Sequence, residues 1–188
     1  MKSGELQKLS DEQLIKHILK DSEIFGVIVD RYTDKLMRFI RRISGVSTEQ
    51  AEDLLQDIFL KMYQNLNSFD TELKFSSWAY RIARNHTISY HRKKSRQPEY
   101  ELKDETAAKL ASDLKIEHEV DKKIEAERIN QVLSDMKPKY RDIIILKFLE
   151  EKDYNEISDI LKIPLGTIAT RIHRAKAAYK KAYEKRFN

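Results

Sequence analysis

Cysteine is absent from the 188 residues, and glycine and proline are scarce, with 4 and 3 copies. A chain without cysteine has no disulfide framework, no thiol catalysis and no cysteine metal site, and it fits a reducing cytoplasm. The scarcity of turn residues, together with the lack of useful alternating apolar runs, predicts an almost wholly helical protein. No apolar run is long enough to span a bilayer or to direct export, so we expect a soluble, cytoplasmic chain.

The net charge of +5 is modest, but the charges are unevenly distributed. Residues 81–96 hold six basic residues and no acidic residue, and residues 162–188 hold eight basic residues and one acidic residue. Residues 99–121 lie between them and hold eight acidic residues and three lysines. Two basic regions separated by an acidic spacer favour two contacts with one polyanion, although solvated helix faces also produce such runs.

Residues 154–176 have the pattern of two helices joined by a tight turn. Asp153 and Glu156 have the spacing of a capping box for the first helix, and Pro164 fits the first position of the second helix. One side of the second helix is apolar, and the other carries hydroxyls and cations that suit the DNA major groove: Thr167, Thr170, Arg171 and Arg174. The pattern alone leaves a helical hairpin with a solvated basic face as an alternative.

Four helices are predicted in the first 96 residues. Ser10, Ser22 and Ser47 are expected to cap the first three helices, and Ser76 or Ser77 the fourth. The third helix carries the longest apolar stripe in the chain, which predicts a core face: Ala51, Leu54, Leu55, Ile58, Phe59, Met62, Tyr63 and Leu66.

The fourth predicted helix and the polar loop before it, residues 67–74, combine cations with aromatic side chains. Phe69, Trp78, Tyr80 and Tyr90 lie among the arginines, and such a face suits single-stranded nucleic acid, whose phosphates meet cations while its bases stack. The alternative is that these aromatic residues are ordinary core, and for Trp78 we favour that interpretation.

Residues 97–119 are polar, acidic and weakly periodic, which predicts a flexible linker. Helical periodicity returns at residues 120–136, and Pro138 is expected to begin the next helix. We therefore predict an all-α protein of two small helical domains, residues 1–96 and 120–188, joined by that linker.

Two other classes of function can be compared with nucleic-acid binding by two domains. An ordinary helix-turn-helix regulator with a helical N-terminal dimerisation or sensing domain would explain residues 154–176, but it gives no reason for the basic, aromatic stretch at residues 69–96. An enzyme is disfavoured because the five histidines form no metal-spaced pair, and because no phosphate-binding glycine loop or nucleophile-base set occurs. We expect no catalytic residue, no metal and no cofactor.

Several strings resemble one family over nearly the whole chain. They are AEDLLQDIF at residues 51–59, NSFD at 67–70, FSSWAYRIARN at 75–85, MKPKYR at 136–141 and PLGTIATRIHRA at 164–175, together with residues 25–40 and 154–163. In this order and at this separation they resemble the extracytoplasmic-function branch of bacterial RNA polymerase sigma factors. The resemblance implies a sigma region 2-like four-helix domain followed by a sigma region 4-like helix-turn-helix domain.

The resemblance also implies partners and residue roles. Members bind core RNA polymerase and promoter DNA, and an anti-sigma factor is a further expected partner, with no membrane insertion and no small-molecule substrate. The polar face at Asp53, Gln56 and Asp57 would bind the polymerase. Five residues would contact the single-stranded minus-ten element: Phe69, Arg81, Arg84, Asn85 and Arg92. Five would contact the duplex minus-thirty-five element: Thr167, Thr170, Arg171, His173 and Arg174.

Two positions depart from the family pattern. Ala169 stands where relatives usually carry Lys or Arg, so one phosphate contact is expected to be missing. Lys162 stands where Gly is common in the turn, so a non-glycine residue is asked to take the turn conformation. A positive φ there would cost on the order of 1 kcal/mol.

Overall fold

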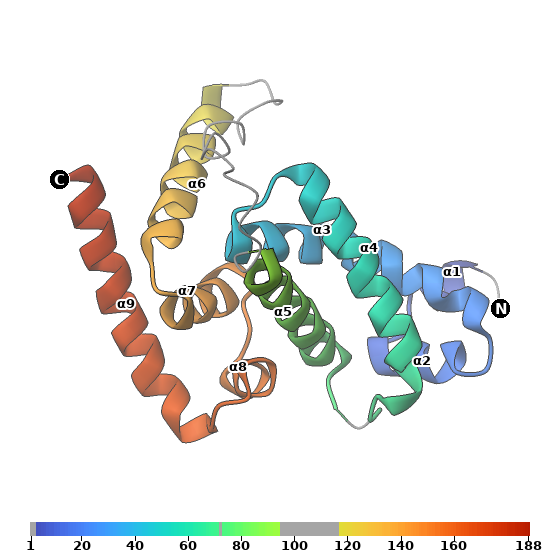
Figure 1. The fold of residues 1–188 in the computed structure, drawn as a ribbon. Coiled ribbons are helices and arrows are strands. Elements are labelled where there is room, and N and C mark those ends of the chain that lie inside the picture. Colours follow the sequence, from blue (N-terminus) through green and yellow to red (C-terminus); the bar gives the residue numbers. More distant parts are fainter. Residues whose placement is uncertain (1–2, 72, 95–116) are drawn as a thin grey trace.

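The computed structural model describes residues 3–71, 73–94 and 117–188, and within these ranges the chain is helical without any strand (Figure 1). The predicted all-α class is confirmed, and residues 97–116 of the predicted linker lie outside the described residues. The α-helices are α1 (Ser3–Leu6), α2 (Asp11–Ile18), α3 (Phe25–Ser44), α4 (Thr48–Asn65), α5 (Phe75–Lys94), α6 (Glu117–Asp135), α7 (Pro138–Ile144), α8 (Tyr154–Leu161) and α9 (Leu165–Phe187). The short elements are the 3₁₀ turns η1 (Ser22–Ile24) and η2 (Leu66–Ser68) and the π-helical turn η3 (Ile145–Leu149).

Local sequence signals place several helix ends correctly. Ser10 and Gln13 form the predicted capping box of α2, and the Ser47 side chain accepts a hydrogen bond from Gln50 N at the start of α4. Gly45 ends α3 with φ of 69°, a left-handed conformation that glycine adopts without steric cost. In each case the residues that form the cap are close in sequence.

Two predicted caps are wrong because other residues supply them. Asp21, not Ser22, accepts the hydrogen bond from Glu23 N, and it caps the turn η1 before α3 begins. Neither Ser76 nor Ser77 caps α5, which begins at Phe75. The Glu12 side chain of α2 accepts the hydrogen bond of Phe75 N at 3.0 Å instead.

The C-terminal helices form the predicted helix-turn-helix unit. Asp153 and Glu156 make the expected capping box of α8, and Pro138 takes the first position of α7. Pro164 is the cap residue immediately before α9, one position earlier than predicted, because α9 begins at Leu165. Lys162 has φ of 53°, so the residue that replaces the family's glycine does adopt the left-handed conformation.

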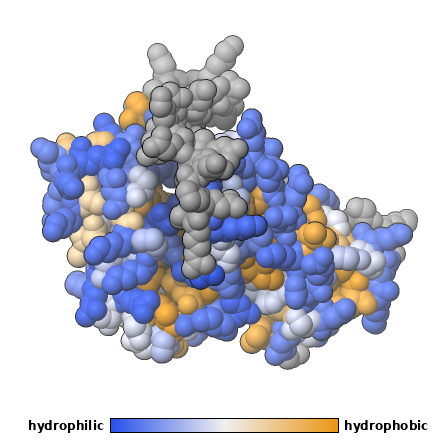
Figure 2. Space-filling view, viewed as in Figure 1, coloured by the Kyte–Doolittle hydropathy of each residue, from blue (hydrophilic) through white to orange (hydrophobic). Residues whose placement is uncertain are grey.

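Helix α5 lies in the middle of the molecule, with α3 and α4 on one side and α7 and α8 on the other (Figure 1). One continuous cluster of buried apolar residues extends from Leu6 in α1 to Ala175 in α9. Hydrophilic residues dominate the face seen in Figure 2, and apolar residues form separate small patches on it. The helices α1–α5, called the N-terminal unit below, and α6–α9, called the C-terminal unit, are therefore packed together along α5.

The longest predicted apolar stripe is buried along most of α4, with one exception. Tyr63 is 46% exposed and lies edge-on against the Phe25 ring, with ring centroids 5.3 Å apart. The assignment of Tyr63 to the core was therefore wrong, because α3 covers only one side of this ring and leaves the rest to solvent.

Candidate nucleic-acid interface

A cavity of about 320 Å³, wide open to solvent, lies between α4 and α5. Its lining combines apolar, amide, hydroxyl and cationic groups: Lys61, Asn65, Ser68, Trp78, Ile82, Asn85, His86 and Ser89. The amide of Asn85 offers both donors and an acceptor, and the side chain is exposed at the cavity. An aromatic wall beside amides suits a nucleobase that has left the base stack.

The α4 side of this cavity was not predicted. Lys61 and Asn65 are one helical turn apart, so they face the same direction, toward α5. The sequence does carry this signal, since these two polar residues, four positions apart, lie beside the apolar stripe of α4. Recognising it requires knowing that α5 packs beside α4, which is a tertiary contact.

The aromatic residues of this region have different environments. Phe69 is 6% exposed and packs against Phe75 and Trp78, with ring centroids 5.4 and 5.3 Å away. Phe69 therefore packs against Trp78 from the buried side and supports the wall that Trp78 gives to the cavity. Tyr80 is 2% exposed, and its hydroxyl donates a hydrogen bond to Glu150. Tyr80 therefore belongs to the packing between the two units, and the prediction that it faces single-stranded nucleic acid was wrong.

The three predicted arginines of α5 also differ. Arg92 is exposed and Arg81 is half-buried, and neither makes an ion pair within the described ranges. Arg84 Nε lies 2.8 Å from Asp142 Oδ2, and Asp142 is 2% exposed. Arg81 and Arg92 are thus free to meet phosphates, whereas Arg84 is engaged by a carboxylate of the C-terminal unit.

Helix α9 turns its predicted recognition residues away from the core. Ile168, Ile172 and Ala175 are buried against the rest of the C-terminal unit. On the opposite side, three residues are exposed and two are half-buried: Thr170, His173 and Arg174, then Thr167 and Arg171. Hydroxyls in the first turns followed by cations place short donors and acceptors nearest the N-terminus of the helix, the end that meets base edges in helix-turn-helix proteins.

The polar face of α4 presents Asp53, Gln56 and Asp57 to solvent, as predicted. Leu60 lies on the same helix and is 55% exposed, and sequence reasoning did not single it out. The exposed part of this face is therefore mainly polar and acidic, with Leu60 as an exposed apolar side chain within it. Asp57 Oδ2 lies 3.3 Å from His86 Nε2, which links this surface to the cavity of α5.

No group of three or more His, Asp or Glu side chains in the described ranges could hold a metal ion. No helix that the structure describes is long and apolar enough to cross a bilayer.

The chain matches two protein-family models in order. Residues 28–97 match Sigma-70 region 2, and residues 126–178 match Sigma-70, region 4. The chain is 38% identical over 177 residues to the ECF RNA polymerase sigma factor SigW of Bacillus subtilis. The match covers 89% of this chain and 93% of SigW. It is 27% identical over 178 residues to the ECF RNA polymerase sigma-E factor of Haemophilus influenzae. That match covers 90% of this chain and 93% of the sigma-E factor.

Two solved structures resemble the fold. CnrH in complex with the cytosolic domain of CnrY has a TM-score of 0.70 and 20% identity, and the match covers 94% of this chain and 98% of that one. The sigma factor RpoE in complex with the anti-sigma factor NepR from Bartonella quintana has a TM-score of 0.66 and 23% identity, covering 85% and 96%. At these identities the likeness concerns the fold alone.

Proposed function

The chain belongs to the extracytoplasmic-function (ECF) family of RNA polymerase sigma factors, and from this premise we propose which residues divide the work of initiation. It is a non-catalytic polymerase subunit that directs promoter-specific initiation. Its region 2 binds the minus-ten element and its region 4 the minus-thirty-five element. This family membership replaces the alternative of a helix-turn-helix regulator that is not a polymerase subunit.

In region 2, the cavity between α4 and α5 receives a base of the melted minus-ten strand. Asn85 hydrogen-bonds the base edge, and Phe69 holds the Trp78 wall in place. Arg81, Arg84 and Arg92 hold the backbone beside it, with Arg84 available once its carboxylate partner is displaced. This assignment is supported by the open cavity beside Asn85 and by the unpaired state of Arg81 and Arg92 in the described ranges.

In region 4, α9 enters the major groove of the minus-thirty-five element. Thr167, Thr170 and His173 meet base edges or nearby phosphates from the first turns. Arg171 and Arg174 supply the cations, and a bidentate contact to guanine is the commonest base-specific contact of an arginine. One observation carries the proposal. The same chain has an exposed recognition face on α9 and an open cavity between α4 and α5.

The exposed face of α4 supplies the polymerase contact. Asp53, Gln56 and Asp57 form its polar part, and Leu60 adds an apolar centre. An anti-sigma factor is the further partner that we propose, since both solved neighbours are complexes and one is described as a sigma factor with its anti-sigma factor. The place of action is the cytoplasm, where the bacterial polymerase works.

The test begins with core RNA polymerase and a randomised promoter library, from which transcription in vitro selects the preferred minus-ten and minus-thirty-five elements. On the selected promoter, Asn85→Ala is expected to reduce strand opening, measured by permanganate reactivity, while polymerase binding stays intact. Arg174→Ala is expected to weaken minus-thirty-five recognition by about 1–3 kcal/mol, measured as promoter affinity of the holoenzyme.

Matched controls separate these effects from misfolding. Asn155→Ala removes an exposed amide of α8, and Lys180→Ala removes an exposed cation of α9 beyond the recognition residues. Both are expected to behave like the wild type. Equal loss of polymerase binding and strand opening in Asn85→Ala would contradict its assignment to the base pocket.

A further inference from the structure

Gly166 has neither of the structural reasons that usually place a glycine in a fold. It is the second residue of α9, and its φ is not positive, in contrast to Gly45, whose φ is 69°. Apart from its chain neighbours and its own helix backbone, a β-carbon built on Gly166 would meet no atom of the described residues within 4 Å. Neither a left-handed backbone nor close packing within the described residues therefore requires glycine at this position.

Glycine destabilises a helix in which nothing requires it. Its backbone loses more conformational freedom on folding than that of any other residue, so alanine is the better helix former. Beside Gly166, no neighbour among the described residues fills the place of the missing side chain, so nothing there offsets this cost. A third use of glycine is to let a bound molecule approach the backbone closely, and this use does not depend on the protein's own packing.

Gly166 lies in the middle of the outward face of α9. Thr170 follows it by four residues and His173 by seven, so the three residues share one side of the helix. All three are exposed, whereas Ile168 and Ile172 are buried on the opposite side. Of the three, Gly166 is nearest to the N-terminus of α9, the end that meets base edges in helix-turn-helix proteins.

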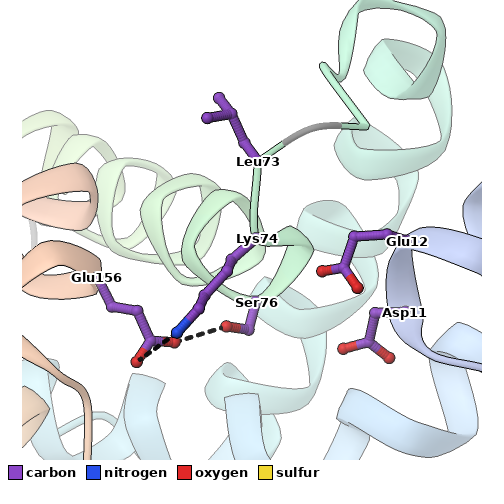
Figure 3. Close-up of a pocket in the computed structure, with 6 residues that line it drawn as sticks. All are labelled: Asp11, Glu12, Leu73, Lys74, Ser76 and Glu156. Atoms are coloured by element: carbon purple, nitrogen blue, oxygen red, sulfur yellow. Dashed lines mark hydrogen bonds and ion pairs between the residues drawn. The ribbon is translucent and has the colours of Figure 1, made fainter.

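The start of α9 differs in its surroundings from the start of α8. Figure 3 shows Lys74 and Ser76 at the start of α5 pointing toward Glu156 of α8. Ser76 donates a hydrogen bond to Glu156 at 3.0 Å, and Lys74 Nζ lies 2.9 Å from Asp153 Oδ2. The first turn of α8 is thus in contact with the N-terminal unit, whereas the space beside Gly166 is open to a molecule from outside.

We propose that Gly166 is the point of closest approach between α9 and the minus-thirty-five duplex, where the surface of the major groove occupies the volume of the missing side chain. Gly166 is a positioning residue, because it sets how deeply α9 enters the groove and how far Thr170 and Arg174 reach. The inference rests on the proposed function of α9 as the reader of the minus-thirty-five element. It adds a residue that acts without a side chain of its own.

A side chain at position 166 acts as a spacer between the helix and the DNA. A β-carbon projects about 1.5 Å from the backbone, and a displacement of about 1 Å takes a hydrogen bond of about 2.9 Å out of its effective range. Thr170 and Arg174 lie about one and about two helical turns further on, so lifting the start of α9 weakens both contacts. The free protein has open space at this position, so the same side chain meets no obstacle there.

The test measures stability and promoter affinity on the same variants, Gly166→Ala and Gly166→Leu. Gly166→Ala is expected to raise the melting temperature of the free chain by about 1–3 °C, because alanine is the better helix former. It is expected to lower the affinity of the holoenzyme for the selected promoter about tenfold, and the larger side chain of Gly166→Leu is expected to lower it further. On a promoter with a scrambled minus-thirty-five element, both variants are expected to bind like the wild type.

Gly26→Ala is the matched control. Gly26 is the second residue of α3, it is exposed, and a β-carbon on it would likewise meet no atom of the described residues within 4 Å. It lies outside the recognition face of α9. The control is therefore expected to gain thermal stability as Gly166→Ala does, with unchanged promoter affinity.

A double variant tests whether Gly166 acts through Arg174. Arg174→Ala is expected to lower promoter affinity about tenfold in the wild-type background. In the Gly166→Ala background the spacer has already weakened the Arg174 contact, so the same substitution is expected to cost about threefold or less. In the Gly26→Ala background it is expected to keep its full effect.

Several results would overturn the inference. They are wild-type promoter affinity in Gly166→Ala, an equal loss on the scrambled promoter, and a lowered melting temperature, which would assign the glycine to the fold. Full additivity with Arg174→Ala would overturn the role in insertion depth. The proposed function is judged by Arg174→Ala alone: if that variant keeps wild-type promoter affinity, the minus-thirty-five assignment fails. If that variant loses affinity, the Gly166 variants decide on this inference by themselves.

Discussion

At the scale of single residues, Lys162 shows backbone strain in the turn before the recognition helix. Its φ is 53° and its ψ is 49°, and its N–H donates to the Ser158 carbonyl at the end of α8. A side chain with a β-carbon costs about 1 kcal/mol or more in this conformation, whereas glycine adopts it freely. The turn is therefore formed in spite of its central residue.

Lys162→Gly is expected to raise the free energy of unfolding by about 0.5–1 kcal/mol, measured by urea denaturation. The gain from relieved strain exceeds the loss from a more flexible unfolded chain. The Lys162 ion pair with Asp159 spans 3.8 Å between largely exposed side chains, so its removal costs little. Lys162→Ala removes the same pair but keeps the strain, and a gain as large in this control would contradict the explanation.

His91 gives a second residue-scale prediction, which concerns pH. Burial lowers its pKa below the ordinary value of 6.5, and the charges of Arg141 in α7 and Lys94 in α5 lower it further. As pH falls below 6.5, the unfolded chain takes up this proton before the folded chain does. The stabilising contribution of neutral His91 is thus complete above pH 6.5 and is lost as pH falls through the lowered pKa.

His91→Gln is therefore expected to reduce the loss of thermal stability between pH 7.5 and pH 5.5, measured as the change in melting temperature. His173→Gln removes an exposed histidine of α9 and serves as the control, which is expected to keep the wild-type dependence. An unchanged pH dependence in His91→Gln would show that other groups dominate this range.

At the scale of elements, the start of α5 depends on α2. Glu12 accepts the hydrogen bond of Phe75 N, and its neighbour Asp11 pairs with Arg31 and bonds to the Tyr32 hydroxyl. Phe75 is fully buried between the Tyr32 and Phe69 rings. Helix α2 lies outside the region 2 match at residues 28–97, yet it fixes the end of α5 nearest the Trp78 wall.

Glu12→Ala is expected to lower the free energy of unfolding by about 1–2 kcal/mol, because a helix N-terminus loses its charged acceptor. It should also slow strand opening by the holoenzyme, since the Trp78 wall is then held less firmly. Glu12→Gln keeps an acceptor oxygen, so it is expected to restore most of the free energy of unfolding and most of the rate of strand opening. If the glutamine variant is as impaired as the alanine variant, the carboxylate charge matters more than the cap.

The caps show how far the sequence alone can predict these elements. The caps at Ser10, Ser47 and Asp153 were predicted because each is formed by residues three positions apart. The cap of α5 was missed because its acceptor, Glu12, is 63 residues away in sequence. The buried positions of α4 followed from periodicity, whereas the exposure of Tyr63 depends on which side of it α3 covers.

At the scale of the whole molecule, the uneven distribution of charge along the chain was visible in the sequence. Which of these charges pair with one another in the folded protein was not visible. The basic stretch at residues 81–96 was interpreted as a surface for a polyanion. Within the described ranges Arg81 and Arg92 form no ion pair, so both can still bind a polyanion. The pairing of Arg84 with Asp142 joins residues 58 positions apart. Such pairings depend on how two units dock, and local patterns contain no information on that.

The same docking leads to a prediction about the free protein. Each unit offers few cations to DNA, so each alone should bind weakly and with steep salt dependence. If core polymerase tethers both units to one promoter, the second contact becomes intramolecular, which can raise overall binding by about 10²-fold to 10⁴-fold. The free full chain is therefore expected to bind the selected promoter duplex no more tightly than micromolar at physiological salt. It should gain sequence specificity only when core enzyme is added, measured by fluorescence anisotropy. A nanomolar, sequence-specific complex without polymerase would contradict this division of labour, because region 4 would then read its element without help.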